Sequence, residues 1–444
     1  MEQNLTAFAD RVLQAATEAG IAPAEVACSR DEAFSVRVRK GDIEDYQVSD
    51  HMSLTLRGRV DGRIGTSSTQ ALDEESIDLL VRGVIESAHL IETDEQDDIL
   101  PPDERYGSVC NYAAALNDIS EQDKIALALD IDARLQGRDA RITPDDTVVA
   151  SADEAYCLKN TLGLDLSHHS NMLYACTGVL AKEGERAATG FEIRWGFGID
   201  AIDPEEMART CCKDALSKLQ AQRLKSGVYP VVIRNSAMAQ LLATFSGVFS
   251  ADNAQKGLSL LAGREGSVIA SPCLTLTDDP LMPWGLASCP FDREGAATRK
   301  KNVIDGGVLT TLLHNRKTAR KAGTQTTGNA AGSGRVTPFN LYIVPGSLTA
   351  EQLLLNLCDG LYLTEVSGLH AGANPISGDF SLLARGCLIR GGKVECTVEQ
   401  FTVAGNFYQL LTDIQSVGSD LLFEASPIGS PSVMVKSLHV AGED

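Results

Sequence analysis

The chain has 444 residues, of which 43% are hydrophobic and 22% are charged, and its formal net charge is −21. This length exceeds what one hydrophobic core usually organises and favours two or three domains, while the composition excludes a largely disordered chain. A duplex-binding surface needs clustered Lys and Arg to neutralise phosphates, so the acidic balance argues against direct nucleic-acid binding.

The first hundred residues have the pattern of an α+β domain. The expected elements are, in chain order, a helix at 4–19, strands at 34–40, 43–48 and 54–57, a hairpin at 60–64 and a helix at 73–91. Asp61-Gly62 predicts a tight turn in the hairpin, because both residue types tolerate a left-handed backbone. An acidic, proline-containing stretch at 93–103 is typical of a linker. We therefore expect an N-terminal domain at 1–103, an antiparallel sheet with flanking helices.

Beyond the linker the pattern shifts from helix and strand to many short strands. The expected elements are a helix at about 120–137, strands across 147–195, a helix from Pro204 to about Gln222, and an apolar strand from Val228. Short strands with Gly turns follow and predict a mixed, largely antiparallel sheet or barrel. We expect a middle α/β domain at 104–225 and a C-terminal β-rich domain at 226–444.

The sequence predicts a cytoplasmic chain with reduced cysteines. The first residues carry acid and lack the apolar core of a secretory signal, and no window approaches 18 consecutive apolar residues. The eleven cysteines are irregularly spaced, and none forms a CxxC pair. We therefore expect small, reduced core residues and no membrane span.

Common catalytic signatures are missing from the sequence. The seven His include no i,i+4 pair, the spacing that lets two imidazoles on a helix reach one zinc ion. No G-x-S-x-G pentapeptide is present to place a serine nucleophile. Gly391-Gly392-Lys393 is the nearest approach to a phosphate loop, and we interpret it as a hairpin turn between strands. The residues by themselves favour a non-enzymatic chain.

Several segments, taken in order, resemble the TldD/PmbA family, whose two paralogous subunits form a heterodimeric peptidase. The matching runs are 39–44 and 65–69 near the N-terminus, and 285–295, 305–309, 364–368, 376–380 and 399–406 in the second half. None of these runs is a strong motif alone. Their order and spacing are preserved over nearly the whole chain, and this collinearity carries the resemblance.

The resemblance implies where a catalytic site would stand. The catalytic member of the family carries H-E-x-x-x-H on a helix after the strand that opens its third domain, with a distant C-terminal Cys as a further metal ligand and the Glu as general base. Here the corresponding positions hold Ala243, Thr244 and Val248, and no Cys follows Cys396. We therefore predict no catalytic residue and no metal ligand in this chain, which is the pattern of the PmbA branch, also called TldE.

The resemblance also implies partners. A TldD-like subunit would supply zinc, and this chain would complete a cleft for unfolded peptides; in isolation we expect a homodimer. Candidate cleft residues are Thr364, Glu365 and the turn Ser377-Gly378-Asp379, although turn chemistry alone explains a Gly-Asp pair. Members of this branch are often called modulators of DNA gyrase, which we interpret as an indirect effect of proteolysis.

Two other functions stay open at this point. A stand-alone hydrolase with an unrecognised site predicts buried carboxylates or His with perturbed pKa values in a cleft. A non-enzymatic partner of DNA gyrase, or of another protein, predicts a stable complex without proteolysis.

Overall fold

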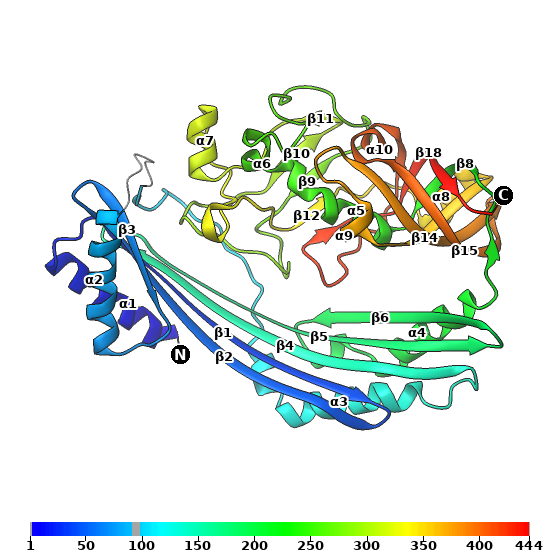
Figure 1. Ribbon diagram of the computed structural model, residues 1–444, viewed down its shortest axis with the longest axis horizontal. Coiled ribbons are helices and arrows are strands. Elements are labelled where there is room, and N and C mark those ends of the chain that lie inside the picture. Colours follow the sequence, from blue (N-terminus) through cyan, green and yellow to red (C-terminus); the bar gives the residue numbers. More distant parts are fainter. Residues whose placement is uncertain (1, 91–97, 444) are drawn as a thin grey trace.

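The computed structural model describes residues 2–90 and 98–443 of the chain. The first half of the chain forms a long, curved antiparallel sheet, and the second half forms a strand-rich part that faces it (Figure 1). The expected α+β class is confirmed in each region: the N-terminal antiparallel sheet, the middle segment of helices and strands, and the mixed C-terminal sheet. Residues 93–97 of the expected linker, and residue 91 at the end of the expected helix, lie outside the described residues.

The long sheet has six strands in the order β3-β2-β1-β4-β5-β6, and every neighbouring pair is antiparallel. The strands are β1 (Ala24–Arg39), β2 (Asp42–Val60), β3 (Arg63–Thr69), β4 (Ile142–Asn160), β5 (Asp165–Glu183) and β6 (Arg186–Gly196). Because β1 pairs with β4 over residues 25–38, strands on both sides of the expected linker form one sheet. The boundaries of the three expected domains stay a prediction.

Helices of the described chain cover one face of this sheet: α1 (Glu2–Glu18), α2 (Glu74–Leu90), α3 (Glu121–Leu135) and α4 (Pro204–Lys218). α3 is capped by Ser120, the residue before it: the Ser120 hydroxyl accepts from the Asp123 amide, and the Asp123 carboxylate accepts from the Ser120 amide. α4 begins after Asp203 and has proline at its first position, where the missing N–H costs nothing. These start signals agree with the helices expected near residues 120 and 204.

Three separate apolar cores lie along the helix-covered face, and two of them share strand β1. Val26 and Cys28 of β1 belong to the core beneath α1 and α2, whereas Val36 and Val38 belong to the core beneath α3 and the short helix η1 (Ala114–Asp118). Because side chains alternate along a strand, these four even-numbered residues share one face. The stretch of β1 between the two cores carries Arg30 and a polar hollow.

The expected tight turns are both confirmed. Asp61 and Gly62 join β2 to β3 with φ values of 49° and 84°, the left-handed conformation at both central positions that a two-residue hairpin requires. Gly391 and Gly392 join two C-terminal strands in the same way, with φ values of 54° and 76°. The Gly391-Gly392-Lys393 segment is therefore a hairpin turn and not a phosphate loop.

The C-terminal part contains two sheets. The larger is mixed, with the order β16-β18-β8-β13-β14-β15-β7, and an extra pairing of β15 with β18 closes it into a barrel. Its strands are β7 (Gln222–Arg223), β8 (Gly227–Ile233), β13 (Gly360–Ser367), β14 (Asp379–Arg390), β15 (Lys393–Asn406), β16 (Ile414–Val417) and β18 (Val433–Ala441). The smaller sheet, in the order β11-β10-β9-β12-β17, contains β9 (Leu276–Asp278), β10 (Lys301–Asp305), β11 (Val308–Leu309), β12 (Leu341–Ile343) and β17 (Ile428–Gly429).

Short helices pack around these two sheets. They are α5 (Asn235–Phe245), α6 (Ala251–Gln255), α7 (Arg316–Ala322), α8 (Ala350–Leu357), α9 (Leu369–Gly372) and α10 (Phe407–Asp413), with the 3-10 turn η3 (Ser246–Phe249) directly after α5. One large apolar core joins both sheets to α5 and α10. Within the described residues, no helix combines the length and apolar character needed to cross a membrane.

Candidate functional site

The helix that corresponds to the catalytic helix of the resembling family is α5, continued by η3. Ala243 is partly buried and packs against the large C-terminal core. The Thr244 hydroxyl donates to the carbonyl of Gln240 one turn earlier, 2.9 Å away. Val248 lies on η3 and is only 1% exposed. All three side chains are therefore used in local packing and local hydrogen bonding.

An aromatic cluster fills the space beside α5. The Phe245 ring stacks on Phe407 of α10 with centroids 4.6 Å apart, and it lies 6.3 Å from Phe380 of β14. Phe245 and Phe407 are fully buried. Large, close-packed aromatic side chains of this kind contribute mainly to core stability.

The chemistry of these positions does not fit a zinc ion. Methyl and isopropyl groups offer no lone pair, and a threonine hydroxyl is not a carboxylate base. In the part of the chain that the structure describes, no group of three or more His, Cys, Asp or Glu side chains could hold a metal ion. No reaction step can therefore be assigned to a metal held by α5 and η3.

Thr364 and Glu365, two of the candidate cleft residues, lie on β13 at an irregularity in its pairing with β14. The Thr364 hydroxyl donates to the Arg385 carbonyl at 3.3 Å. The Glu365 carboxylate is 2.9 Å from the Lys218 ammonium group of α4 and 3.7 Å from the Arg385 guanidinium group. Glu365 therefore links the C-terminal barrel to the helix layer of the long sheet.

The turn Ser377-Gly378-Asp379 is held by local hydrogen bonds. The Asn406 side-chain amide donates to the Ser377 carbonyl and to the Asp379 carboxylate, each at 2.8 Å. Gly378 has φ of 83°, and a Cβ there would stand 2.5 Å from the Tyr408 ring, so only glycine fits. The bonds from Asn406 and Ser377 lower the pKa of Asp379 below its ordinary value. Turn chemistry accounts for these three residues, and their role in a cleft stays a prediction.

The two candidate sets do not come together. Glu365 pairs with Arg385 on β14, and Asp379 lies six residues earlier on that strand. At about 3.3 Å per residue, Asp379 and Glu365 are roughly 20 Å apart along the sheet. The two sets therefore do not touch each other, and an extended chain of about six residues would be needed to contact both.

A cleft lies between the long sheet and the C-terminal part. Its volume is about 330 Å3, and an adjoining hollow adds about 120 Å3. The sheet contributes side chains of β4 and β5, and the C-terminal part contributes residues of the segments 286–293 and 330–339. The Arg293 guanidinium group crosses the cleft: it lies 3.9 Å from the centroid of the Tyr156 ring and 2.6 Å from the Glu154 carboxylate. A mostly apolar cleft with a few fixed polar groups is typical of ligand-binding sites.

Burial perturbs several titratable groups in this cleft. It raises the pKa of Tyr156 to about 12 and lowers the pKa of His168 below its ordinary value, so His168 is neutral at pH 7. It also raises the pKa of Asp292 to about 6, although the backbone amides of Glu294, Ala296 and Ala330 donate to this carboxylate and oppose the shift. Asp292 is therefore held by backbone amides of its own turn and of the segment that begins at Ala330.

The cleft combines hydrogen-bonding side chains with a thiol that is not activated. Cys289 lines it, and burial raises the pKa of this thiol to about 11, so it carries no thiolate near neutral pH. The neutral imidazole of His168 and the Glu154–Arg293 pair can accept and donate hydrogen bonds. These groups could bind and orient a chain through hydrogen bonds, and the cleft thiol is not activated as a nucleophile.

Sequence reasoning missed the residues of this cleft. Arg293 lies in the run 285–295 that the family resemblance singled out, which was the available signal. Its partner Glu154 is 139 positions earlier, on a strand whose place in the sheet depends on pairing with β1. No local pattern connects the two residues.

Comparison with known proteins agrees with this architecture. The PmbA/TldA metallopeptidase domain 1 matches residues 24–88, the central domain of that family matches 114–219, and its C-terminal domain matches 226–442. The chain belongs to the PmbA/TldD family, and the resemblance inferred from the sequence is confirmed.

Individual relatives extend over nearly the whole chain. Metalloprotease PmbA of Escherichia coli O157:H7 is 27% identical over 429 residues, which covers 95% of this chain and 92% of the relative. A solved structure from Thermotoga maritima, described as a candidate modulator of a DNA gyrase, is 31% identical with a TM-score of 0.91 and covers 98% of this chain and 99% of its own. TldE from Thermococcus kodakarensis shares the fold, with a TM-score of 0.88 at 21% identity and the same two coverages.

Proposed function

We propose that this chain is the metal-free subunit of a cytoplasmic, two-chain metallopeptidase of the TldD/TldE type, acting on unfolded peptides. The observation that carries the proposal is the apolar and hydroxyl chemistry of Ala243, Thr244 and Val248, where the catalytic family member has imidazoles and a carboxylate. A TldD-like partner would supply the zinc site and the general base. The relative named metalloprotease PmbA, similar over 95% of this chain, supports a role in proteolysis.

Within this proposal, the chain contributes binding and orientation. The cleft beside Glu154 and Arg293 would hold an extended peptide through backbone hydrogen bonds and apolar contacts, which give affinity with little dependence on sequence. Orienting a substrate in this way assists a reaction whose chemical groups lie on the other subunit.

The test is to purify this chain alone, a TldD-like chain from the same organism alone, and the two together. We expect cleavage of an unstructured peptide by the mixture, and neither zinc nor cleavage in this chain alone, by elemental analysis and chromatography. As a control, the partner with both motif His residues replaced by Ala should give an inactive mixture. Stoichiometric zinc in this chain, or cleavage by it alone, would overturn the proposal.

A second candidate function is direct modulation of DNA gyrase. The observation that favours it is the description of the Thermotoga maritima structure, which is 31% identical to this chain. The net charge of −21 is compatible with contact to a basic surface of a DNA-binding enzyme. A supercoiling assay with gyrase and this chain alone distinguishes the candidates: a direct modulator changes the rate without the peptidase partner, and a peptidase subunit does not.

The shifted pKa values of His168 and Asp292 are a reason to test the stand-alone hydrolase with the same three samples. That function predicted buried titratable groups in a cleft, and both residues satisfy this criterion. Two observations argue against a stand-alone hydrolase: the Cys289 thiol is protonated near neutral pH, and the Asp292 carboxylate accepts hydrogen bonds from backbone amides. Peptide turnover by the isolated chain would favour the hydrolase.

A further inference from the structure

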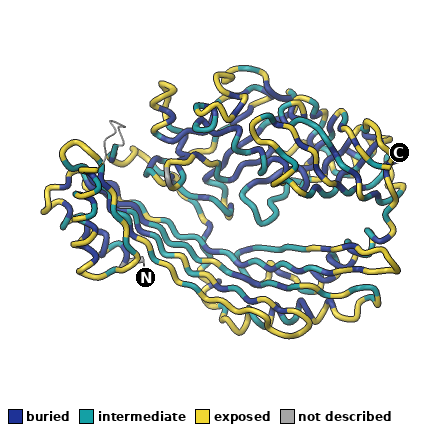
Figure 2. Tube along the Cα trace, viewed as in Figure 1, coloured by how far each residue is buried: buried dark blue, intermediate teal, exposed yellow. Residues whose placement is uncertain are grey.

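The outer strand β2 has a free edge over its first twelve residues. β3 pairs with β2 only from Leu54 to Val60, so residues 42–53 have no neighbouring strand on that side among the described residues. Every residue from Asp42 to Val48 is exposed, and Figure 2 shows exposed residues along this strand. Residues 42–53 span about 40 Å in extended form, and the outward N–H and C=O groups of such an edge can pair with another strand.

An apolar strip runs along this edge. Ile43, Tyr46 and Val48 are 49%, 45% and 54% exposed, respectively. Their cross-strand neighbours on β1 are all buried in the core beneath α3: Val38, Val36 and Phe34. The buried core therefore borders exposed apolar side chains at the edge of the sheet, and one further strand would shield these side chains from solvent.

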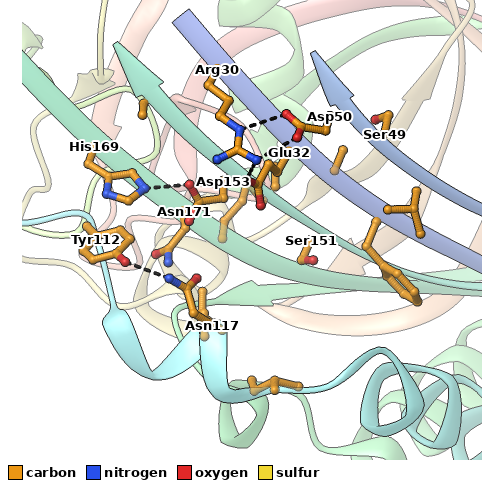
Figure 3. Close-up of a pocket in the computed structure, with 18 of the residues that line it drawn as sticks. Arg30, Glu32, Ser49, Asp50, Tyr112, Asn117, Ser151, Asp153, His169 and Asn171 are labelled. Atoms are coloured by element: carbon orange, nitrogen blue, oxygen red, sulfur yellow. Dashed lines mark hydrogen bonds and ion pairs between the residues drawn. The ribbon is translucent and has the colours of Figure 1, made fainter. Parts of the chain in front are cut away.

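The strip continues into a polar hollow of about 1040 Å3 between the two cores that share β1 (Figure 3). Asp50, Glu32 and Asp153 lie in register on the adjacent strands β2, β1 and β4. Arg30 bonds to Asp50 at 2.7 and 2.9 Å and to Glu32 at 2.7 Å, and His169 bonds to Asp153 at 2.6 Å. Like charges directly across a sheet repel. The Lys and Arg side chains that line the hollow, Arg30 and Lys124, do not balance these three carboxylates and Glu121, so its walls carry an excess of negative charge.

The edge itself is acidic and unpaired. Residues 42–53 include four Asp or Glu and no Lys or Arg. Asp42, Glu44 and Asp45 form no ion pair in the described structure. The two arginines across the ladder are already occupied, because Arg37 and Arg39 contact carboxylates of Asp145 and Asp146 on β4.

We propose that residues 42–53 of β2 bind an extended, cationic segment of an unfolded polypeptide by strand addition. Apolar side chains of the segment would cover Ile43, Tyr46 and Val48, and Lys or Arg side chains would meet Asp42, Glu44 and Asp45 and enter the hollow at Asp50. A second copy of this chain fits the edge poorly, because antiparallel self-pairing brings two acidic strands together. The proposal needs neither a metal nor a catalytic partner, so it stands or fails independently of the proposed peptidase role.

The experiment uses a fluorescent peptide of about nine alternating Lys and Val residues, with binding to the full chain measured by anisotropy. The test variant Asp42→Lys/Glu44→Lys/Asp45→Lys should bind it at least about tenfold more weakly, since three favourable charge contacts become repulsive. The control variant Glu75→Lys/Asp78→Lys/Glu351→Lys changes the net charge equally at exposed helix positions without ion pairs, and its affinity should stay within about twofold.

A second probe tests the backbone pairing itself. The same peptide with N-methyl groups on alternate amides keeps its charge but cannot pair along one edge, and we expect its binding to be lost. Equal binding of the methylated peptide, or equal weakening in the control variant, would overturn the proposal. Absence of peptide binding to the unaltered chain would also overturn the proposal. So would sedimentation that shows a homodimer of the unaltered chain and of the control variant but a monomer of the test variant, because a second copy would then occupy the edge.

Discussion

The segment α5–η3 and the cleft beside β4 differ in how the chain uses side-chain chemistry. In α5 and η3, where the family resemblance would place the metal ligands of a catalytic member, Ala243 and Val248 are apolar and Phe245 fills the core. In the cleft, Glu154 and Arg293 are charged and paired across two parts of the fold. In α5 and η3 the side chains serve packing, whereas in the cleft charged groups form a contact between the two parts of the fold.

Replacing Phe245 by Ala should give the largest loss of stability. The ring is fully buried and contacts Phe380 and Phe407, so its removal leaves a cavity and costs about 3–5 kcal/mol. Urea denaturation measures the change. Thr244→Ala is the control: this hydroxyl only donates to the carbonyl of its own helix, and we expect a change within about 0.5 kcal/mol. Equal effects of the two substitutions would show that α5 is not a packing helix.

Val248→His tests whether the helix accepts a metal ligand. The position is 1% exposed and surrounded by core residues, so an imidazole there would be buried without a partner and cost about 2–3 kcal/mol. Added zinc should not restore the urea midpoint. If zinc restores the stability of the variant, other side chains near position 248 must complete a metal site. The helix would then not differ from the cleft as a region used only for packing.

In the cleft, Asp292 should make stability depend on pH. Its folded pKa of about 6 lies above the ordinary value of 3.8, so its stabilising contribution is complete below the ordinary value and is lost as pH rises through the folded value. Relative to Asp292→Asn, which cannot ionise, the native chain should lose about 2–3 kcal/mol across this window. Parallel urea midpoints for the two proteins from about pH 4 to about pH 7 would contradict the assignment.

Arg293→Met should have the smallest effect of the four. It removes the ion pair with Glu154 and the stacking on Tyr156, but the guanidinium group is partly exposed, so we expect a loss of about 1 kcal/mol. Arg293→Lys keeps the charge without the planar stacking surface, so its stability should lie between that of the unaltered chain and that of Arg293→Met. The midpoint of thermal unfolding measures the stability of both variants. A higher midpoint for Arg293→Met would show that the contact of Arg293 with Glu154 and Tyr156 does not stabilise the fold.

Local signals in the sequence predicted much of the fold. The Asp61-Gly62 turn and the helix start at Ser120 depend on residues that are adjacent along the chain, and both are present in the structure. The union of the N-terminal and middle strands in one sheet depends on pairing between residues more than 100 positions apart, such as Glu25 and Asn160. No periodicity or turn residue encodes that pairing.

The candidate site was harder to predict than the fold. Thr364-Glu365 and Ser377–Asp379 are close in sequence, yet β13 and β14 run antiparallel and place them roughly 20 Å apart. The groups that define the cleft, Glu154 and Arg293, come from opposite halves of the chain. Their partnership is a property of tertiary structure, which a single sequence does not display.

The ion pair between Lys218 and Glu365 has a consequence for assembly. Together with the contact of Arg293 to Glu154, it fastens the two halves of the chain at separate points, and the Trp195 indole adds a hydrogen bond to the Phe423 carbonyl. Contacts of this kind restrain the two halves relative to each other, so a surface to which both contribute is preorganised and loses less conformational entropy when a subunit or peptide docks. Loss of either ion pair should therefore lower the affinity for such a partner, because the ordering cost would then be met on docking.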